Sequence, residues 1–416
     1  MNHEPSTIND QRSTINHQRS MINDQRSTMN NSQLNRGFWR DKKVLITGHT
    51  GFKGSWLCLW LQHLGADVVG YSLDPPSDPN LFEVAQVGDG MKSARGDVRD
   101  FGYLSGVMSE HQPEIVLHLA AQALVRRSYS DPLETYSTNI MGTVNVLESV
   151  RRTPSVRVVV NVTSDKCYEN KEWVWGYREN DPMGGHDPYS CSKGCSELVT
   201  ASYLKSFFSP EAFGQKHNVV LASVRAGNVI GGGDWGADRL VPDCVRALHG
   251  DEEIVLRNPK AVRPWQHVLD PLGGYLLLAE RLWCDGPRFA GAWNFGPTDK
   301  DVWTVGDVVK EIIRLWGGGT YRAESNGHVH EANQLKLDCS KARIELGWSA
   351  CYDIQDMLSR SIEWYKSFYE GASSFELRDR ILECIGLVPD HNDFTSATYF
   401  LPKKMTRARI PFGSVT

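Results

Sequence analysis

The stretch VLITGHTGFKGSWL, Val44–Leu57, places three glycines between an apolar run and the start of a helical pattern. Gly48 suits a tight turn, Gly51 lets a pyrophosphate approach the backbone, and Gly54 lets a helix pack closely on a sheet. The free N–H groups of a helix that starts here would face the phosphates. A glycine triplet is weak evidence by itself, but its position between a strand and a helix predicts a dinucleotide-binding site.

Other residues expected at the dinucleotide follow later strand-like runs. Asp74 comes after the second run, where a carboxylate can bind both ribose hydroxyls and repel a 2′-phosphate, so NAD is favoured over NADP. The alternative for Asp74 is a solvated loop acid before two prolines. Asp97 follows a third run and suits an adenine contact, and the small residues of LHLAAQ leave room for a cofactor. The predicted cofactor-binding residues are Gly48, Gly51, Phe52, Lys53, Gly54, Asp74, Asp97, Val98, Leu119, Ala120, Ala121, Tyr189 and Lys193.

Apolar strand-like runs alternate with helical patterns on either side of this stretch. The runs are Val44–Thr47, Val68–Ser72, Ile115–Leu119, Val158–Thr163 and Val219–Val224, and the helical patterns are Lys53–Leu64, Leu133–Arg152 and Tyr189–Phe207. Continuous apolar strands between helices are typical of a parallel sheet covered on both faces. We therefore expect an α/β fold, with a doubly wound, mostly parallel, Rossmann-type sheet and a smaller C-terminal lobe.

The pattern changes near residue 228. A glycine-rich segment, GNVIGGGDWGADRLVPD, is followed by the short pieces EIVLRN, WQHVLD and AWNFGP and by helical patterns at Val305–Leu315 and Ile354–Phe368. We expect an NAD-binding domain at 40–228 and a mainly substrate-binding lobe at 229–370, with segments that return to the first domain. Residues 371–416 show no obvious packed unit and form an extension of unknown role.

Residues 1–36 repeat with a period of seven, as in STINDQR and STINHQR. Each repeat offers one apolar position, whereas a coiled coil needs two, so disorder is the expectation. Translation of a seven-base DNA repeat also gives a seven-residue period. We hypothesise that the segment is translated repeat DNA, with Met21 and Met29 as candidate starts.

The composition excludes several classes of function. A formal charge of −5 over 416 residues provides no basic field for nucleic acid or an acidic membrane. No apolar run approaches the ~20 residues of a membrane span, and the N-terminus lacks the apolar core of a signal peptide. The nine cysteines include no CxxC pair, and Cys191 and Cys195 lack further zinc ligands, so no metal site is expected. This cysteine usage suits a reducing compartment, and we expect the cytoplasm.

Two further motifs bear on chemistry. In DPYSCSK, Tyr189 and Lys193 are one helical turn apart, so an ammonium beside the phenol would favour the phenolate, a base for a hydroxyl proton. In VTSDKCY, the end of a buried run presents Asp165 next to Lys166. The pair Tyr-x-x-x-Lys is common on any helix, and the glycine turn is what makes it informative.

The motifs TGHTGFKG, LAAQ, TSDKCY, YSCSK, RAGNVIGGGDW and RPWQHV occur in order between about residues 40 and 370. In this range the chain resembles the extended short-chain dehydrogenase/reductases and, within them, the nucleotide-sugar 4,6-dehydratases. The last four motifs resemble the branch that acts on CDP-glucose. The resemblance also implies a homodimer or a higher homo-oligomer, formed through helices that flank the sheet.

The resemblance implies a three-stage reaction with bound NAD. Carbon C4 of the sugar is oxidised, with Tyr189 taking the hydroxyl proton and Ser164 holding the oxygen. Water then leaves across C5 and C6, with Asp165 as the acid, and hydride returns to C6. The product is a 4-keto-6-deoxy sugar.

Lys166 departs from the wider family pattern, in which a glutamate acts as the C5 base. The CDP-glucose branch is similar to this chain in carrying lysine there. An unperturbed lysine, with a pKa of ~10.4, is mostly protonated at neutral pH and cannot accept a proton. We hypothesise that nearby cations and desolvation make Lys166 neutral, so that it removes the C5 proton. The alternative is a lysine that merely pairs with Asp165.

The predicted substrate-binding residues are Asn228, Arg239 and Arg263. By resemblance, Asn228 contacts the sugar nucleotide, and the glycines that follow it in GNVIGGGDW allow close approach of the backbone to this substrate. Arg263 clamps the diphosphate, while Arg239 is equally compatible with a surface charge. Three alternatives remain open: a nucleotide-sugar 4-epimerase, a 4,6-dehydratase of another nucleotide sugar, and a non-catalytic NAD-binding scaffold. The pair Asp165–Lys166 favours elimination over epimerisation, and the intact Ser164, Tyr189 and Lys193 argue against a scaffold.

Overall fold

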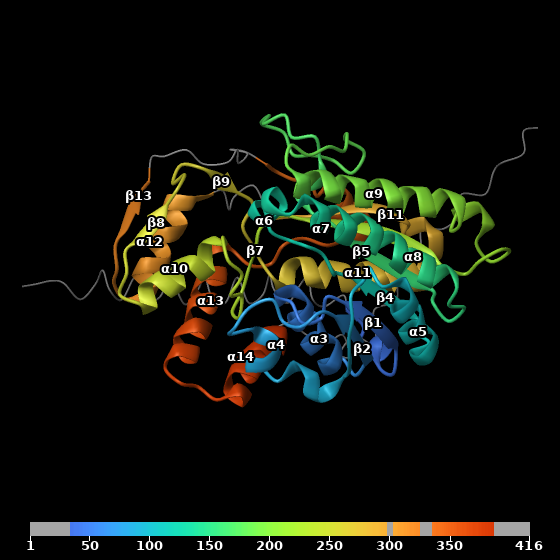
Figure 1. Ribbon diagram of the computed structural model, residues 1–416, viewed down its shortest axis with the longest axis horizontal. Coiled ribbons are helices and arrows are strands. Elements are labelled where there is room, and N and C mark those ends of the chain that lie inside the picture. Colours follow the sequence, from blue (N-terminus) through green and yellow to red (C-terminus); the bar gives the residue numbers. More distant parts are fainter. Residues whose placement is uncertain (1–33, 298–302, 325–334, 387–416) are drawn as a thin grey trace, which may run out of the picture.

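The computed structural model describes residues 34–297, 303–324 and 335–386. Its centre is a seven-stranded sheet in the order β11-β6-β5-β4-β1-β2-β3, and every neighbouring pair is parallel (Figure 1). The strands are β1 (Lys43–Thr47), β2 (Asp67–Ser72), β3 (Lys92–Arg95), β4 (Ile115–His118), β5 (Val158–Val162), β6 (Val220–Ala226) and β11 (Gly291–Phe295). The predicted α/β fold with a doubly wound parallel sheet is confirmed.

Helices cover both faces of this sheet and bury its alternating side chains. Val44 and Ile46 of β1 belong to one core, and Leu45, between them in sequence, belongs to the other. This alternation follows from the two-residue period of a strand. The first core is covered by α3 (Phe52–His63) and α11 (Leu269–Asp285), and the second by α5 (Phe101–His111), α8 (Gly142–Arg151) and α9 (Pro188–Ser206).

The smaller C-terminal part is built around three packed helices: α10 (Leu240–His249), α12 (Val305–Trp316) and α13 (Ile354–Tyr369). Three short strand pairs accompany them: β7 (Val229–Ile230) with β10 (Gln266–His267), β8 (Ile254–Leu256) with β13 (Tyr321–Ala323), and β9 (Val262–Arg263) with β12 (Trp303–Thr304). The remaining helices are α2 (Arg36–Trp39), α4 (Leu81–Val84), α6 (Val125–Ser130), α7 (Pro132–Tyr136) and α14 (Ser374–Gly386).

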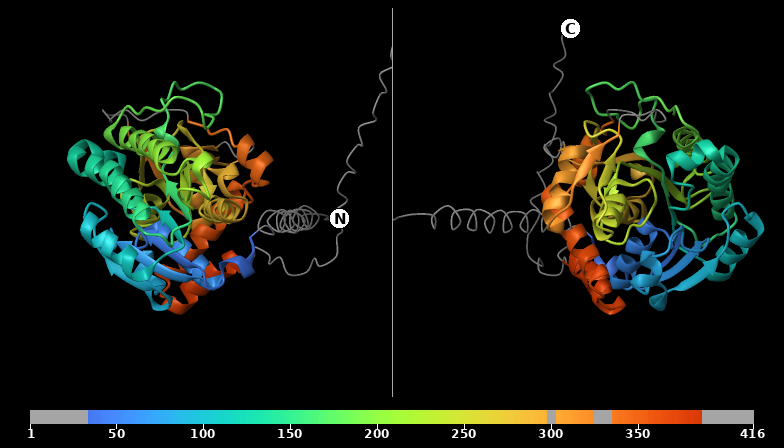
Figure 2. Two further views of the ribbon diagram at one scale, coloured as in Figure 1. Left: turned by 90° about the vertical axis from the view of Figure 1, so that its right-hand side faces the viewer. Right: turned by 60° about the vertical axis from the view of Figure 1, so that its left-hand side comes forward.

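Two segments differ from the sequence-based expectation because their partners lie far away in the chain. AWNFGP is not an isolated piece, since β11 completes the main sheet beside β6. The part of the chain beyond residue 370 also contains a packed helix. In α14, Leu377, Ile381 and Ile385 are buried, and the helix packs against α3 and α13 (Figure 2).

The segment before β1 also joins the fold. Leu34 and Trp39 are buried, and the Trp39 Nε1 atom donates a hydrogen bond to Glu280 on α11 at 2.6 Å. The predicted disordered tail at 1–36 therefore extends slightly too far, and residues 1–33, with the heptapeptide repeats, lie outside the described residues. Within the described ranges no helix combines the length and the apolar character that a bilayer span needs.

Candidate active site

The glycine turn has the shape that a dinucleotide requires. A Cβ on Gly48, whose φ is +77°, would lie 2.7 Å from the backbone nitrogen of Ala120, and one on Gly54 would lie 2.1 Å from the Gly48 carbonyl oxygen. The protein itself therefore excludes side chains at these two positions. A Cβ on Gly51 would meet nothing closer than 3.4 Å, so its glycine leaves space for a ligand. Because Gly51 precedes α3 as its N-cap and no side chain caps the helix, the residues present fit a bound pyrophosphate.

The two acids predicted at the adenosine end both pair with arginines. The Asp74 carboxylate is 88% exposed and lies 3.1 Å from Arg95. Arg99 hydrogen-bonds the Asp97 carboxylate and thereby lowers its pKa. The Asp97 backbone oxygen accepts a hydrogen bond from Tyr71. Asp74 is thus open to a ribose, whereas the Asp97 side chain already has a partner.

The segment after β5 brings an acid into a buried position. Ser164 caps the short turn Asp165–Cys167, and its Oγ atom donates to Asp165 Oδ1 at 3.0 Å and accepts from the Lys166 N–H at 3.2 Å. Asp165 is 2% exposed, and no hydrogen-bond partner of its Oδ2 atom occurs among the described residues. Burial raises the pKa of Asp165, although Lys166, Ser164 and Lys53 oppose this rise. The raised pKa favours the protonated acid.

Helix α9 directs Tyr189 and Lys193 to the same place. Asp187 caps the helix by accepting from the Ser190 N–H, and Pro188 occupies its first turn, so Tyr189 faces Ser164. Burial raises the pKa of Tyr189 to about 12, while the hydrogen bond with Ser164 and the charge of Arg239 lower it. Ser164, Asp165 and Tyr189 are therefore together at the carboxyl end of β5.

Lys193 and Lys53 reach this cluster from two helices. The Lys193 Nζ atom donates to the carbonyl oxygen of Val162, the last residue of β5, at 3.3 Å. Burial and the charge of Lys53 lower the Lys193 pKa to about 8. Burial and Arg239 likewise lower the pKa of Lys53 to about 8, while Asp165 opposes this shift. Lys53 was predicted at the cofactor, and the structure also places its ammonium within electrostatic range of the catalytic candidates.

The predicted substrate residues divide between two places. Arg239 donates to Asp234 at 2.8 Å and acts on the Tyr189 pKa, so it belongs to the cluster. The Asn228 backbone oxygen accepts from the Gln266 N–H, which ties its loop to β10. Arg263 lies on β9 and donates to the Val262 carbonyl oxygen.

The glycines of GNVIGGGDW have a different role from the expected close approach to substrate. A Cβ on Gly232 would lie 2.4 Å from the Trp364 ring, and one on Gly233 would lie 2.5 Å from Leu81. Packing against α13 and α4 therefore accounts for these two glycines.

Comparisons with known proteins place the chain in a family. Residues 45–286 match the family model described as GDP-mannose 4,6 dehydratase. The CDP-glucose 4,6-dehydratase of Salmonella typhimurium is 53% identical over 81% of this chain and 94% of that protein. The chain belongs to the GDP-mannose 4,6 dehydratase family.

More distant members of the same group also match. A dTDP-glucose 4,6-dehydratase of Xanthomonas campestris is 25% identical over 77% of this chain and 92% of that protein. The solved dTDP-glucose 4,6-dehydratase DesIV of Streptomyces venezuelae, with NAD and TYD bound, superposes with a TM-score of 0.67 at 23% identity, over 78% of this chain and 97% of that one. This last likeness shows that the fold is shared with the dehydratases.

In this member of the GDP-mannose 4,6 dehydratase family, a buried ion pair that was not predicted from the sequence lies beside the turn Asp165–Cys167. Glu197 and Arg225 are each 4% exposed and lie 2.7 Å apart. Glu197 also accepts from Thr163 and Ser223, and Arg225 donates to Tyr168. The network joins β5, β6 and α9 around the turn that carries Ser164. The signal in the sequence was an arginine inside an otherwise apolar strand, LASVRA.

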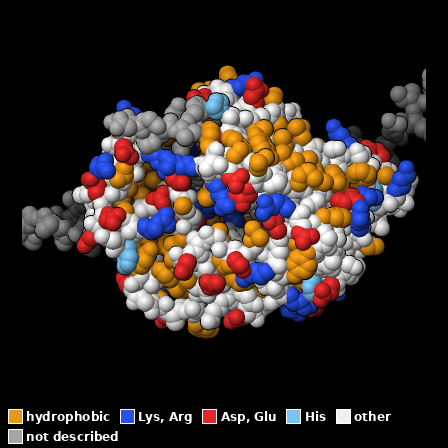
Figure 3. Space-filling model, in the orientation of Figure 1, with side chains coloured by type: hydrophobic (Ala, Val, Ile, Leu, Met, Phe, Trp, Pro, Cys, Tyr) orange, Lys and Arg blue, Asp and Glu red, His pale blue; other side chains and the backbone are white. Residues whose placement is uncertain are grey.

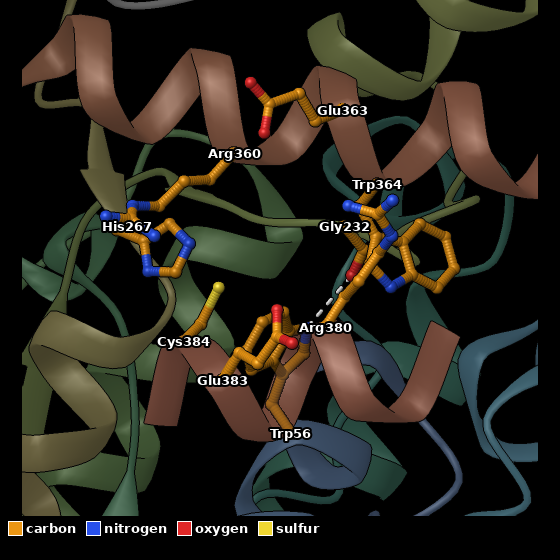
Figure 4. Close-up of a pocket in the computed structure, with 9 residues that line it drawn as sticks. All are labelled: Trp56, Gly232, His267, Arg360, Glu363, Trp364, Arg380, Glu383 and Cys384. Atoms are coloured by element: carbon orange, nitrogen blue, oxygen red, sulfur yellow. Dashed lines mark hydrogen bonds between the residues drawn. The ribbon is translucent and has the colours of Figure 1, made fainter. Parts of the chain in front are cut away.

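A separate cavity of about 100 Å³ lies between α3, α13 and α14 (Figure 4). Trp56, Arg360 and Arg380 contribute to its lining, together with Gly232 of the glycine-rich segment. None of the candidate catalytic residues of this family member lines the cavity, so the chemistry is assigned to the cluster at the end of β5.

Proposed function

We propose that the chain is an NAD-dependent CDP-glucose 4,6-dehydratase that forms CDP-4-keto-6-deoxyglucose and water. The observation that carries the proposal is the buried Asp165, with a raised pKa and an unpartnered Oδ2 atom, beside Ser164 and Tyr189. An elimination needs such an acid for the departing hydroxyl. The 53% identity to the Salmonella enzyme, against 25% for a dTDP-glucose enzyme, supports CDP as the nucleotide.

The residues would divide the work as follows. Ser164 orients the C4 hydroxyl, and Tyr189 removes its proton as the phenolate. Bound NAD, held at the glycine turn and by Asp74, would accept the C4 hydride and return it to C6. Asp165 donates its proton to the leaving C6 hydroxyl, and Lys166 removes the C5 proton. The Lys166 ammonium would then return a proton to C5 when hydride reaches C6. Arg239, whose charge already favours the phenolate, is placed to bind the sugar nucleotide.

The assay is incubation of purified protein with CDP-, dTDP-, UDP- and GDP-glucose, followed by measurement of the 4-keto-6-deoxy product. Turnover of CDP-glucose alone is the expected result, and turnover of dTDP-glucose instead would reject the assigned nucleotide. Asp165→Asn should block water loss yet still permit oxidation, seen as reduced nicotinamide that accumulates. A 4-epimerase would instead give the epimeric sugar without net water loss, and a scaffold would give no product.

The C5 base is tested by exchange of C5 deuterium into solvent. Lys166→Met is expected to abolish the exchange while C4 oxidation continues. Lys53→Met is the informative companion, because burial and neighbouring charge lower the Lys53 pKa to about 8 and make it a second amine near Asp165. Exchange that persists in the first variant and stops in the second would transfer the role to Lys53.

We also expect a homodimer or a higher homo-oligomer in the cytoplasm. Leu133 on α7 and Leu198 on α9 are 82% and 61% exposed, and Figure 3 shows hydrophobic side chains gathered over these helices. Large exposed apolar patches of this kind mark interaction surfaces. Sedimentation of wild type beside Leu133→Glu tests the assembly, and a wild-type monomer would exclude it.

A further inference from the structure

The acid expected at the adenosine ribose forms one half of an ion pair. Arg95 Nε lies 3.1 Å from Asp74 Oδ1, and the two side chains are 39% and 88% exposed. Arg95 is the last residue of β3 and pairs in register with Ser72, the last residue of β2. The ion pair therefore stands at the carboxyl edge of the sheet, where a ligand can reach both charges.

The guanidinium is held in this position by neighbours on other sides. Arg95 Nη1 donates to Ser93 Oγ and to His49 Nε2, both at 3.2 Å. Its carbon Cζ lies 4.9 Å from the centre of the Phe82 ring. A guanidinium can only donate, so the His49 Nε2 atom must present a lone pair to it. Because His49 belongs to the glycine turn, Arg95 is a preorganised cation between that turn and Asp74.

This location matters for one substituent of a dinucleotide. In this fold the carboxylate after the second strand binds the 2′-hydroxyl of NAD, and a nearby arginine can accommodate the 2′-phosphate of NADP. Asp74 offers the first kind of contact and would repel the phosphate. Arg95 offers the second kind, with the planar geometry that suits phosphate oxygens.

We propose that Arg95 is a latent site for the 2′-phosphate of NADP. Together with Asp74, whose carboxylate is already expected to repel that phosphate, it forms a selector for the 2′ position of the dinucleotide. The inference rests on the proposed binding of NAD. Removal of the Asp74 charge alone should then raise the affinity for NADP, because the cation that binds the 2′-phosphate, Arg95, is already present.

The test is fluorescence titration of the full chain with NADH and with NADPH, in the absence of sugar nucleotide. Asp74→Asn is expected to tighten NADPH binding about tenfold or more, on the scale of one charge-assisted hydrogen bond, and to weaken NADH binding. The double variant Asp74→Asn/Arg95→Gln should lose that gain. Asp67 and Lys92 form an ion pair across the same two strands at their other ends. Asp67→Asn and Lys92→Gln are therefore matched controls, which should leave both affinities unchanged.

Two outcomes would overturn the selector: no gain of NADPH affinity in Asp74→Asn, or a gain that survives in the double variant. A gain in the Asp67→Asn control would also overturn it, because general charge would then explain the effect. Dinucleotide binding is measured without turnover, so a failed dehydratase assay leaves the result intact. Binding of neither dinucleotide by wild type would reject both the selector and the proposed cofactor.

Discussion

Replacement of Glu197 by glutamine tests whether the buried ion pair holds the turn Asp165–Cys167, with the proposed catalytic residues, in place. The carboxylate accepts from Arg225 at 2.7 Å, from Ser223 at 2.7 Å and from Thr163 at 2.5 Å. A glutamine keeps the shape but loses the charge, and its amide nitrogen cannot accept a hydrogen bond. If the amide nitrogen faces Thr163, that hydroxyl can accept from it and donate to the Val224 carbonyl oxygen, but the charge that balances Arg225 is lost in either orientation.

The expected loss of stability follows from the burial of both charges. Removal of one partner from a buried ion pair typically lowers the free energy of unfolding by ~3–5 kcal/mol. Arg225 keeps its hydrogen bonds to Tyr168 and to the Glu179 carbonyl oxygen, so the lower end, about 3 kcal/mol, is expected. Because Thr163 adjoins Ser164, kcat should fall more than KM changes.

Denaturant unfolding and steady-state kinetics measure the two effects. The matched control is Glu253→Gln, since Glu253 and Arg322 form an ion pair at 3.2 Å in which the side chains are 45% and 54% exposed. Its loss should change stability by less than ~1 kcal/mol. A loss below ~1 kcal/mol in Glu197→Gln would refute the reasoning from burial. The double variant Glu197→Leu/Arg225→Met should recover stability, because both charges are gone. Full recovery of kcat in this double variant would show that the ion pair does not position the turn.

Two further predictions concern pH. We expect the Tyr189–Lys193 pair to be active once it has lost one of its two protons, so kcat/KM should rise as the pH approaches about 8. In Lys193→Met only Tyr189 can lose a proton, so the rise should move toward about 12. An unchanged pH profile in this variant would contradict the pairing. Burial raises the pKa of Glu280 from 4.5 to about 7, so the native state holds a proton that the unfolded state has lost, and stability falls as pH rises between these values. The free energy of unfolding of Glu280→Gln relative to wild type should therefore be higher at pH 8 than at pH 5, by up to about 3 kcal/mol, when both proteins are denatured at each pH. An equal difference between variant and wild type at both pH values would argue against the buried carboxyl.

The parts of the fold that the sequence predicted best are those with local signals. The apolar runs of β1, β2, β4, β5 and β6 and the glycine turn depend on neighbouring residues, and the structure confirms them within one or two positions. Strand β11 and helix α14 escaped prediction because their partners, β6 and α3, are distant in sequence.

In the candidate site, too, the residues with a local sequence signal were predicted and those that depend on distant partners were not. The resemblance to the nucleotide-sugar dehydratases implied that Ser164 and Tyr189 act together, and the structure brings these two side chains into hydrogen-bond contact. The ion pair of Glu197 with Arg225 was not predicted, because nothing in the sequence specifies which charge on α9 faces a charge on β6. The glycines at 232 and 233 were assigned to substrate, since the aromatic and aliphatic side chains that need their space lie elsewhere in the chain.

Burial explains how one small site can hold both an acid and bases near neutral pH. Desolvation disfavours every charged form, so it raises the pKa of Asp165 and lowers those of Lys53 and Lys193. The pKa values of a carboxyl group and an amine, which differ widely in water, are thereby brought closer together. An elimination takes a proton from one carbon and gives another to a neighbouring oxygen, and both transfers become easier when donor and acceptor are matched in this way. Asp165 is thus suited to the acid step of an elimination because it is buried, and an exposed aspartate would not be.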